Sequence, residues 1–242
     1  SNIEHLFPIG EANGTHGVYR PGGSALNAGQ VGGYRAAQFI AARYGEEPPS
    51  VDKFLAMIRH SLEKKIELLA GFVERTHPES TSVNEVRNEI QERMTTYAAH
   101  IRSLEGIRKA LHEAYTLRDQ LKDRLVISSR QELLSAVELV ELTTTHLVYL
   151  EAIREYLERG GGSRGSYIVL ELEPNGRCPS EKLGREWCYK PFDDTLMDRI
   201  CEIWFDENMK IVTEWIKVHP IPTEEDWFEK VWQEYREDHI IK

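Results

Sequence analysis

A glycine-rich segment near the beginning of the sequence carries the residues whose types and spacing could do chemistry. Its glycines are Gly10, Gly14, Gly17, Gly22, Gly23, Gly29, Gly32 and Gly33. A backbone with so few side chains lets its N–H groups approach a ligand closely. The helix expected to start near Ser24 or Ala25 would direct its positive end at the same place, which suits an anionic or electron-rich group. Glu11, after a short apolar run, suits a ribose hydroxyl, whereas Arg20 offers a planar fork of donors for a carboxylate or phosphate. The segment therefore predicts a ligand site, with a solvated glycine-rich turn as the alternative that the pattern leaves open.

Other kinds of site find less support in the sequence. No G-x-G-x-x-G follows an expected strand, so this segment is not the primary dinucleotide-binding motif. The nine histidines lack the spacing of metal ligands, and we expect no metal site. The cysteines, Cys178, Cys188 and Cys201, are odd in number and irregularly spaced. They predict reduced structural thiols rather than a disulfide framework, and a cytoplasmic location.

A short strand and a helix are the elements that would position the glycine-rich segment. Leu6–Ile9 is an apolar run that predicts a strand, and residues 31–43 have the composition of a helix. The order strand, glycine loop, helix is typical of a piece of an α/β domain, and we assign residues 1–45 to such a piece.

Long helices are expected to follow. Apolar residues recur at every third or fourth position in several stretches, which is the pattern of one buried helix face. The helices predicted in this way cover 51–73, 83–104 or as far as 111, about 113–125, and a stretch from Ser128 or Ser129 to the stop at Gly160–Gly162. We therefore expect a mainly α fold in which residues 46–165 form an antiparallel three- or four-helix bundle.

The last part of the chain, residues 166–242, reads as a small α+β region. Tyr167–Leu172 is a strand-like run, and residues 200–205 and 210–218 predict a hairpin around Asp206–Met209. The sequence Thr223–Asp226 is a capping box that opens a helix. The five tryptophans all lie in this region, which indicates either its own core or a docking surface for an electron-transfer partner.

Composition excludes some classes of function. The 242 residues carry a formal net charge of −10, which argues against nucleic-acid binding as the main role. No uninterrupted run of about 18 apolar residues is present, so we expect no membrane span. The first residues lack the pattern of a signal peptide, which again favours the cytoplasm.

The glycine-rich segment resembles the end of the FAD domain in succinate dehydrogenase and fumarate reductase flavoproteins and in the related L-aspartate oxidases. There the sequence reads like G-L-[YF]-A-x-G-E, then H-G-A-N-R-L-G-x-N-S-L, then a helix with V-x-G-R-x-A. This chain has LFPIGEA at 6–12, HGVYRPGGSAL at 16–26 and VGGYRAA at 31–37, in the same order. Weaker similarity continues at Val86–Met94, 162–167 and 210–215.

The resemblance implies a role for each matching residue. Gly10 and Glu11 would contact the FAD ribose, and Arg20 would bind a carboxylate of the substrate. The backbone of a third group would hold the pyrimidine edge of the flavin: Gly22, Gly23, Ser24, Ala25 and Leu26. The helix dipole there would stabilise negative charge on the reduced flavin and so promote hydride acceptance. Tyr19, Pro21 and Ser24-Ala25 depart from the family pattern, so the resemblance implies an anionic substrate, with a C4 dicarboxylate favoured.

The resemblance also implies what lies outside this chain. The family's G-x-G-x-x-G and its substrate-capping domain precede the matched segment, and in several members electrons pass to an iron–sulfur subunit. We therefore expect the chain alone to bind FAD weakly or not at all and to be inactive. In the full protein it would act in the cytoplasm, or at the membrane through partner subunits. Two alternatives stay open: a non-catalytic helical module that docks a partner subunit, and the chemistry of adenylylsulfate reductase or L-aspartate oxidase.

Overall fold

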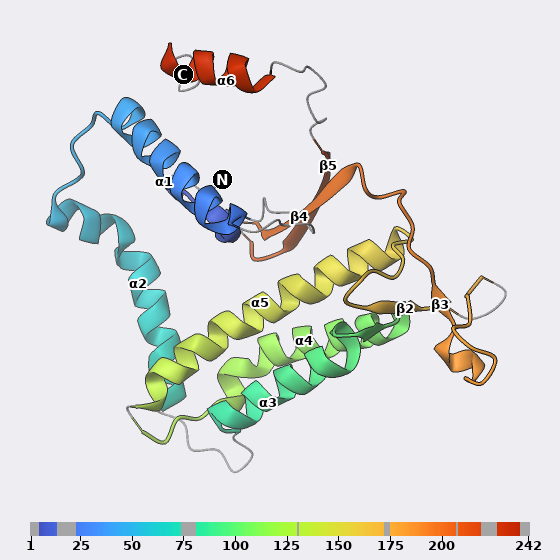
Figure 1. The fold of residues 1–242 in the computed structure, drawn as a ribbon. Helices are drawn as coiled ribbons and strands as arrows, with labels where there is room; N and C mark the ends of the chain where they lie inside the picture. The colour runs from blue at the N-terminus through green and yellow to red at the C-terminus, as the bar shows by residue number, and fades with distance from the viewer. Residues whose placement is uncertain are drawn as a thin grey trace. The chain divides into compact units, whose positions relative to one another are not determined.

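The chain is mainly helical, as its apolar periodicity predicts (Figure 1). The computed structural model describes residues 5–13, 23–73, 81–129, 131–171, 175–206, 208–218 and 227–237. Two compact units divide it: Ser1–Ala56 with Pro220–Lys242, and Met57–His219. Helix α2 (Val51–Val73) begins in the first unit and ends in the second.

The first unit contains three elements besides the beginning of α2. They are a 3-10 turn η1 (Gly10–Asn13), helix α1 (Ser24–Arg43) and helix α6 (Trp227–Arg236). Gln38 of α1 donates a hydrogen bond from Nε2 to the Tyr235 hydroxyl of α6 over 3.4 Å. The capping box predicted at Thr223–Asp226 lies outside the described residues.

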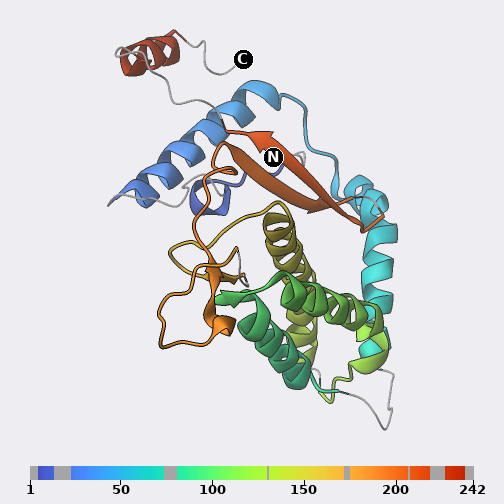
Figure 2. The same ribbon diagram turned by 90° about the vertical axis from the view of Figure 1, so that its right-hand side faces the viewer.

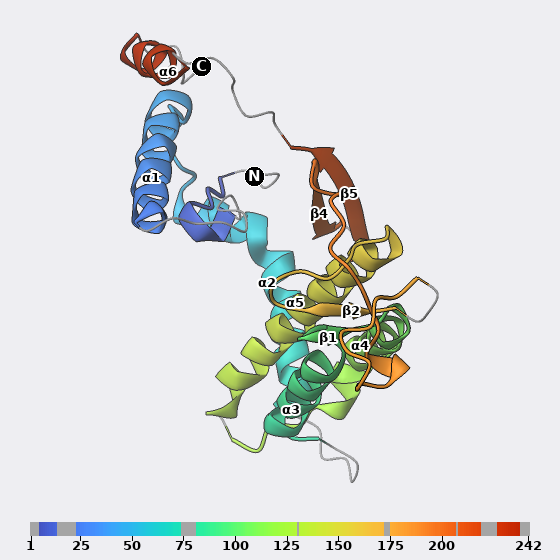
Figure 3. The ribbon, with the colours of Figure 1, turned by 45° about the vertical axis from the view of Figure 1, so that its right-hand side comes forward.

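The second unit is built on three helices that pack side by side, as Figure 3 shows: α3 (Val83–Arg93), α4 (Leu104–Arg124) and α5 (Glu132–Glu158). The short strands β1 (Ile101–Arg102), β2 (Ile168–Leu170) and β3 (Tyr189–Lys190) form one sheet, in which β1 is parallel to β2 and β3 antiparallel to it. A second sheet is the hairpin of β4 (Arg199–Phe205) and β5 (Ile211–Lys217), which lies beside α5 (Figure 2).

The prediction of one helix from residue 83 to 104 or beyond is wrong. Helix α3 ends at Arg93, and a π-helical turn η2 (Met94–Ala98) leads into β1. Ile101 and Arg102 are extended because they pair with Ile168 and Val169 of β2. Ser103 then caps a new helix by accepting a hydrogen bond from the Gly106 N–H over 3.0 Å, so α4 begins at Leu104 rather than near 113.

Local signals set the other helix ends. Ser82 and Glu85 form a reciprocal capping box at the start of α3, which the Ser-x-x-Glu spacing could have indicated. Ser128 does not cap α5 directly: its N–H donates to the Glu132 carboxylate over 2.7 Å, and the helix starts at Glu132. The end of α5 is where the glycine triplet predicted it, since Gly160 takes a φ of +85° that favours glycine.

Two hydrophobic clusters make up the core of the second unit, and α5 contributes to both. One holds Phe72, Ile90, Leu117 and Leu139, and the other holds Ala110, Leu147, Leu150 and Val169, each with further neighbours. Burial of such side chains stabilises a fold by roughly 1.5–3 kcal/mol each.

Helix α5 conflicts with the expectation that no segment resembles a membrane span. Among the described residues it is the one helix whose length and composition would allow it to cross a membrane. Its most apolar stretch, residues 133–150, contains only two acidic residues, Glu138 and Glu141, and no lysine or arginine. Nine of its residues are nevertheless buried within this chain. We therefore interpret α5 as the core helix of a folded domain.

The predicted hairpin is confirmed at its strands and at its turn. β4 and β5 pair in antiparallel register from Arg199 with Lys217 to Phe205 with Ile211. At the turn, the Asp206 carboxylate accepts hydrogen bonds from the N–H groups of Asn208 and Lys210, each over 2.8 Å. An aspartate at the start of a turn bonds in this way to the backbone that follows it, so the turn could be predicted from the sequence.

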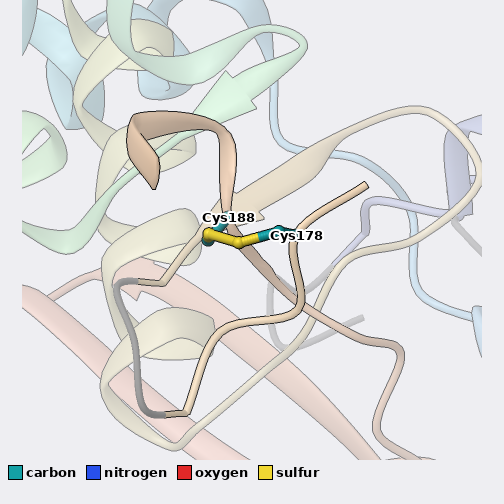
Figure 4. The surroundings of a disulfide bond; sticks show 2 residues. All are labelled: Cys178 and Cys188. Carbon is teal, nitrogen blue, oxygen red and sulfur yellow. A yellow bond between two sulfur atoms is a disulfide. The ribbon is translucent and has the colours of Figure 1, made fainter. Parts of the chain in front are cut away.

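The prediction of three reduced thiols is wrong for two of them. Cys178 and Cys188 are joined by a disulfide, shown in Figure 4, and Cys201 is free. The neighbouring residues Arg177 and Tyr189 exchange two backbone hydrogen bonds, which bring the two cysteines together. An odd cysteine count cannot reveal such a pairing, because it depends on the path of the loop between them.

We expect the disulfide to stabilise the loop that it closes. Its cysteines are 10 residues apart in sequence, and closing so short a loop contributes about 2–3 kcal/mol through the unfolded chain. Denaturation without reductant should expose one alkylatable thiol, Cys201, and denaturation with reductant should expose three. The variant Cys178→Ser should lower the free energy of unfolding of this segment, whereas Cys201→Ser should leave it within about 0.5 kcal/mol. Three alkylated thiols without reductant would contradict the assignment.

A group of charged and polar side chains links α3, α4 and α5; we call it the polar layer, and it consists of Glu89, Arg93, Glu113, Arg124 and His146. Arg93 donates to Glu89 over 2.7 Å and to Glu113 over 3.0 Å, and Arg124 donates to Glu89 over 2.7 Å.

Arg93 is 6% exposed and His146 is 2% exposed. Burial, aided by the charge of Arg93, lowers the pKa of His146 to about 4, against a smaller opposing effect of Glu89.

This depressed pKa predicts a loss of stability on acidification. In the unfolded chain His146 binds a proton below the ordinary histidine pKa of about 6.5, whereas in the folded chain it binds one only near pH 4. The free energy of unfolding should therefore fall by about 2 kcal/mol between pH 7 and pH 5 on account of His146 alone. Urea unfolding at pH 7, 6 and 5 measures this, with His146→Leu as the variant that loses the dependence. His112→Leu, on the exposed side of α4, should retain it; an unchanged slope in His146→Leu would refute the assignment.

Candidate flavin and substrate site

The segment expected to bind the cofactor is described at Gly10–Asn13 and from Gly23 onward, whereas Arg20 and Gly22 lie outside the described residues. Gly10 is buried and has a φ of +61°, a conformation that favours glycine. A Cβ atom at Gly10 would lie 3.2 Å from the Cα atom of Gly29 in α1. Two glycines therefore allow the η1 backbone to pack directly on the helix.

Helix α1 presents a face of small residues to this segment. A Cβ atom added to Gly32 or to Gly33 would lie 3.3 Å from the Ile9 side chain. Gly29, Gly32 and Gly33 are spaced by three and four residues, so they share one side of the helix. This face seats Ile9 and Gly10, and the spacing is the signal by which sequence reasoning could have found it.

Aromatic contacts fix the chain just before the turn. The Phe7 ring lies 5.8 Å from Phe39 and 6.1 Å from Tyr44, both at the end of α1. Residues 6–9 form no strand, which corrects the expectation for Leu6–Ile9. A strand needs a partner for its backbone hydrogen bonds, and the part of the chain described in this unit supplies none.

The start of α1 has the character of an anion site. The helix begins at Ser24, as predicted, and its cap residue Gly23 supplies no side-chain hydrogen bond. No acidic residue lies in the first turn, so the positive end of the helix is not neutralised locally. The buried Ser24 hydroxyl oxygen has no hydrogen-bond partner among the described residues. The first turn, which includes Ala25 and Leu26, can therefore donate N–H groups to an electron-rich ligand.

The structure brings together part of the expected set. Gly10 is buried against α1, and the next residue of the same turn, Glu11, is exposed. Within the described ranges, no group of three or more His, Cys, Asp or Glu residues could hold a metal ion. The described part of the site can therefore hold an electron-rich, flat or anionic group through backbone N–H groups.

Helix α1 also carries apolar surface that this chain leaves uncovered. None of its residues is buried, and Leu26, Val31 and Tyr34 are 77%, 49% and 57% exposed. Exposed apolar patches of this kind mark contact surfaces.

Comparison with known proteins relates the chain to a family of enzymes. No family model matches it. It is 30% identical over 172 residues to one of the subunits of the fumarate reductase (CoM/CoB) of Methanothermobacter marburgensis, and the match covers 69% of this chain and 30% of that protein.

Solved structures share its fold. A quinol–fumarate reductase with menaquinol molecules matches 92% of this chain and 35% of its own, with a TM-score of 0.65 and 20% identity. The Sdh1 complex of Mycobacterium smegmatis also matches 92% of this chain and 35% of its own, with a TM-score of 0.61 and 19% identity. The chain thus spans about a third of the length of its relatives. The resemblance to succinate dehydrogenase and fumarate reductase flavoproteins is thereby confirmed, and the chain is similar to about one third of a flavoprotein subunit of this type.

Proposed function

We propose that this chain is the C-terminal part of an FAD-dependent oxidoreductase that transfers a hydride between flavin and an anionic substrate, with a C4 dicarboxylate favoured. The observation that carries the proposal is the packing of Gly10 on Gly29 beside the uncapped start of α1. Gly10 and the start of α1 also lie in the segments that resemble flavoproteins of this type. FAD, when bound, would supply the hydride acceptor.

Each residue of the segment has a distinct task in this proposal. Glu11 accepts hydrogen bonds from the ribose hydroxyls of the cofactor. Arg20 pairs with one carboxylate of the substrate and so orients it. The backbone N–H groups of a further set hold the pyrimidine edge of the flavin: Gly22, Gly23, Ser24, Ala25 and Leu26. The unneutralised helix end stabilises the negative charge that develops there during reduction.

The remaining length of the relatives suggests what completes the site. We propose that an N-terminal FAD domain and a substrate-capping domain supply the other contacts, and that the exposed apolar side of α1 packs against them. In this scheme residues 1–45 end the FAD domain, 46–165 form an antiparallel helical bundle, and 166–242 form a small α+β region. An iron–sulfur subunit would take up the electrons and hold the complex at the membrane surface.

An extension experiment tests the proposal. The 242-residue chain and a protein extended by the upstream domains would be purified, and FAD measured by visible absorption. The extended protein should retain about one FAD per chain and the short chain little or none. In the extended protein, Gly10→Val should abolish retention because its Cβ would meet the α1 backbone and its φ is unsuited to a side chain, whereas Gly45→Ala, at an open position, should not. A folded extended protein without flavin would favour the alternative of a helical module that docks a partner.

A further inference from the structure

The polar layer that links α3, α4 and α5 has hydrogen-bonding capacity that the described part of the chain does not satisfy. Nη1 of Arg93 and both ring nitrogens of His146 are buried and have no partner among the described residues. The two side chains come from α3 and α5, which pack against each other, and the charge of Arg93 acts directly on the His146 ring. Buried polar atoms without partners are costly, and native structures rarely leave several in one place.

The charges of the polar layer define what could satisfy these atoms. Glu89 is ionised: burial raises its pKa, but hydrogen bonds from Arg124 and Arg93 outweigh this effect and lower it. The polar layer contains two arginines and two glutamates. They form three ion pairs: Arg93–Glu89, Arg93–Glu113 and Arg124–Glu89. His146 is neutral in this environment. The layer holds no excess positive charge, which disfavours an anion as its occupant.

The donors and acceptors match a water molecule instead. Nη1 of Arg93 is a donor, whereas a neutral imidazole has one donor nitrogen and one acceptor nitrogen. A water can accept from the arginine and donate to the acceptor nitrogen of His146, and buried waters usually make about three such bonds. We propose that the polar layer is a binding site for a long-lived internal water that bridges Arg93 of α3 and His146 of α5.

This water gives the layer a structural role. It would complete the hydrogen bonding between α3 and α5, and so hold the two helices in a single register. Apolar residues at these positions would pack equally well in more than one register, whereas a satisfied polar network specifies one arrangement.

Oxygen-17 relaxation dispersion of the solvent signal tests the proposal, because it counts waters that stay in a protein for longer than its tumbling time. The wild-type 242-residue chain should hold at least one such water, and His146→Leu should hold one fewer. His112→Leu, on the exposed side of α4, should leave the count unchanged. An equal count in the wild type and in folded His146→Leu would overturn the proposal.

One outcome of this test does not depend on the folding of that variant. The absence of any long-lived water in the wild type would refute the proposal by itself. Chlorine-35 relaxation detects a bound halide. A protein-dependent broadening that is present in the wild type and absent in His146→Leu would show that the occupant is an anion rather than a water. We expect no such broadening.

Discussion

Replacing Arg20 by alanine in the extended flavoprotein should lower kcat/KM for a dicarboxylate substrate by about a hundredfold or more. Removing one partner of a desolvated charge pair costs about 2–5 kcal/mol, and each 1.4 kcal/mol is a tenfold change in rate. The loss should appear in kcat as well as in KM, because the arginine orients the substrate for hydride transfer. Steady-state kinetics with a dicarboxylate and an artificial electron carrier measures both.

The matched control for this prediction is Arg59→Ala, which removes the same charge from an exposed position of α2. Its kcat/KM should stay within about twofold, since screened surface charges contribute little. The variant Arg20→Lys should recover only part of the activity because an ammonium cannot form the two-pronged bond of a guanidinium. Equal kinetics in Arg20→Ala and the wild type would remove Arg20 from the substrate site.

Leu147→Ala should destabilise the chain by about 2–5 kcal/mol, which is the usual cost of a cavity at a buried leucine. Leu147 is 0% exposed and lies in the second hydrophobic cluster, with Ala110 and Leu111 of α4. Urea unfolding of the 242-residue chain measures the change, and the midpoint should fall with little change in slope.

The control for this second prediction lies on the same helix. Leu134 is 68% exposed, so Leu134→Ala should alter the free energy of unfolding by less than about 0.5 kcal/mol. The pair tests the interpretation of α5 as a core helix. A helix whose apolar residues served a membrane rather than this core would show two similarly small effects in aqueous solution.

What the sequence predicts well are features fixed by neighbouring residues. The end of α5 follows from Gly160–Gly162, and the β4–β5 hairpin follows from a turn whose aspartate bonds to its own backbone. The start of α1 near Ser24 was likewise predicted from the composition of the loop before it. In each place the signal and the structure lie within a few residues of each other.

Features set by distant residues could not be predicted in this way. Ile101 is extended because it pairs with Ile168, and nothing near residue 101 records that partner. The Cys178–Cys188 disulfide depends on the backbone pairing of Arg177 with Tyr189. Leu6–Ile9 was expected as a strand because it is apolar, yet its apolar side chains pack on α1 instead, through Phe7 and Ile9.

The candidate site also combines features that could be predicted from the sequence with features that could not. The types and order of Gly10, Glu11 and the α1 start could be identified from the sequence, and the similarity of the chain to a flavoprotein family was confirmed. The seat that Gly29, Gly32 and Gly33 provide for Ile9 and Gly10 needed the structure, because it joins two segments across a loop. The roles of all the candidate site residues stay predictions, and two of these residues, Arg20 and Gly22, lie outside the described residues.

The visible absorption spectrum of the extended protein, recorded before and after anaerobic addition of succinate, is the most direct test of the proposed flavin chemistry. We expect an oxidised-flavin band that bleaches as hydride passes to the cofactor. A flavin band that does not bleach would keep the cofactor and redirect the search to other anionic substrates. A folded extended protein with no flavin band would contradict the account.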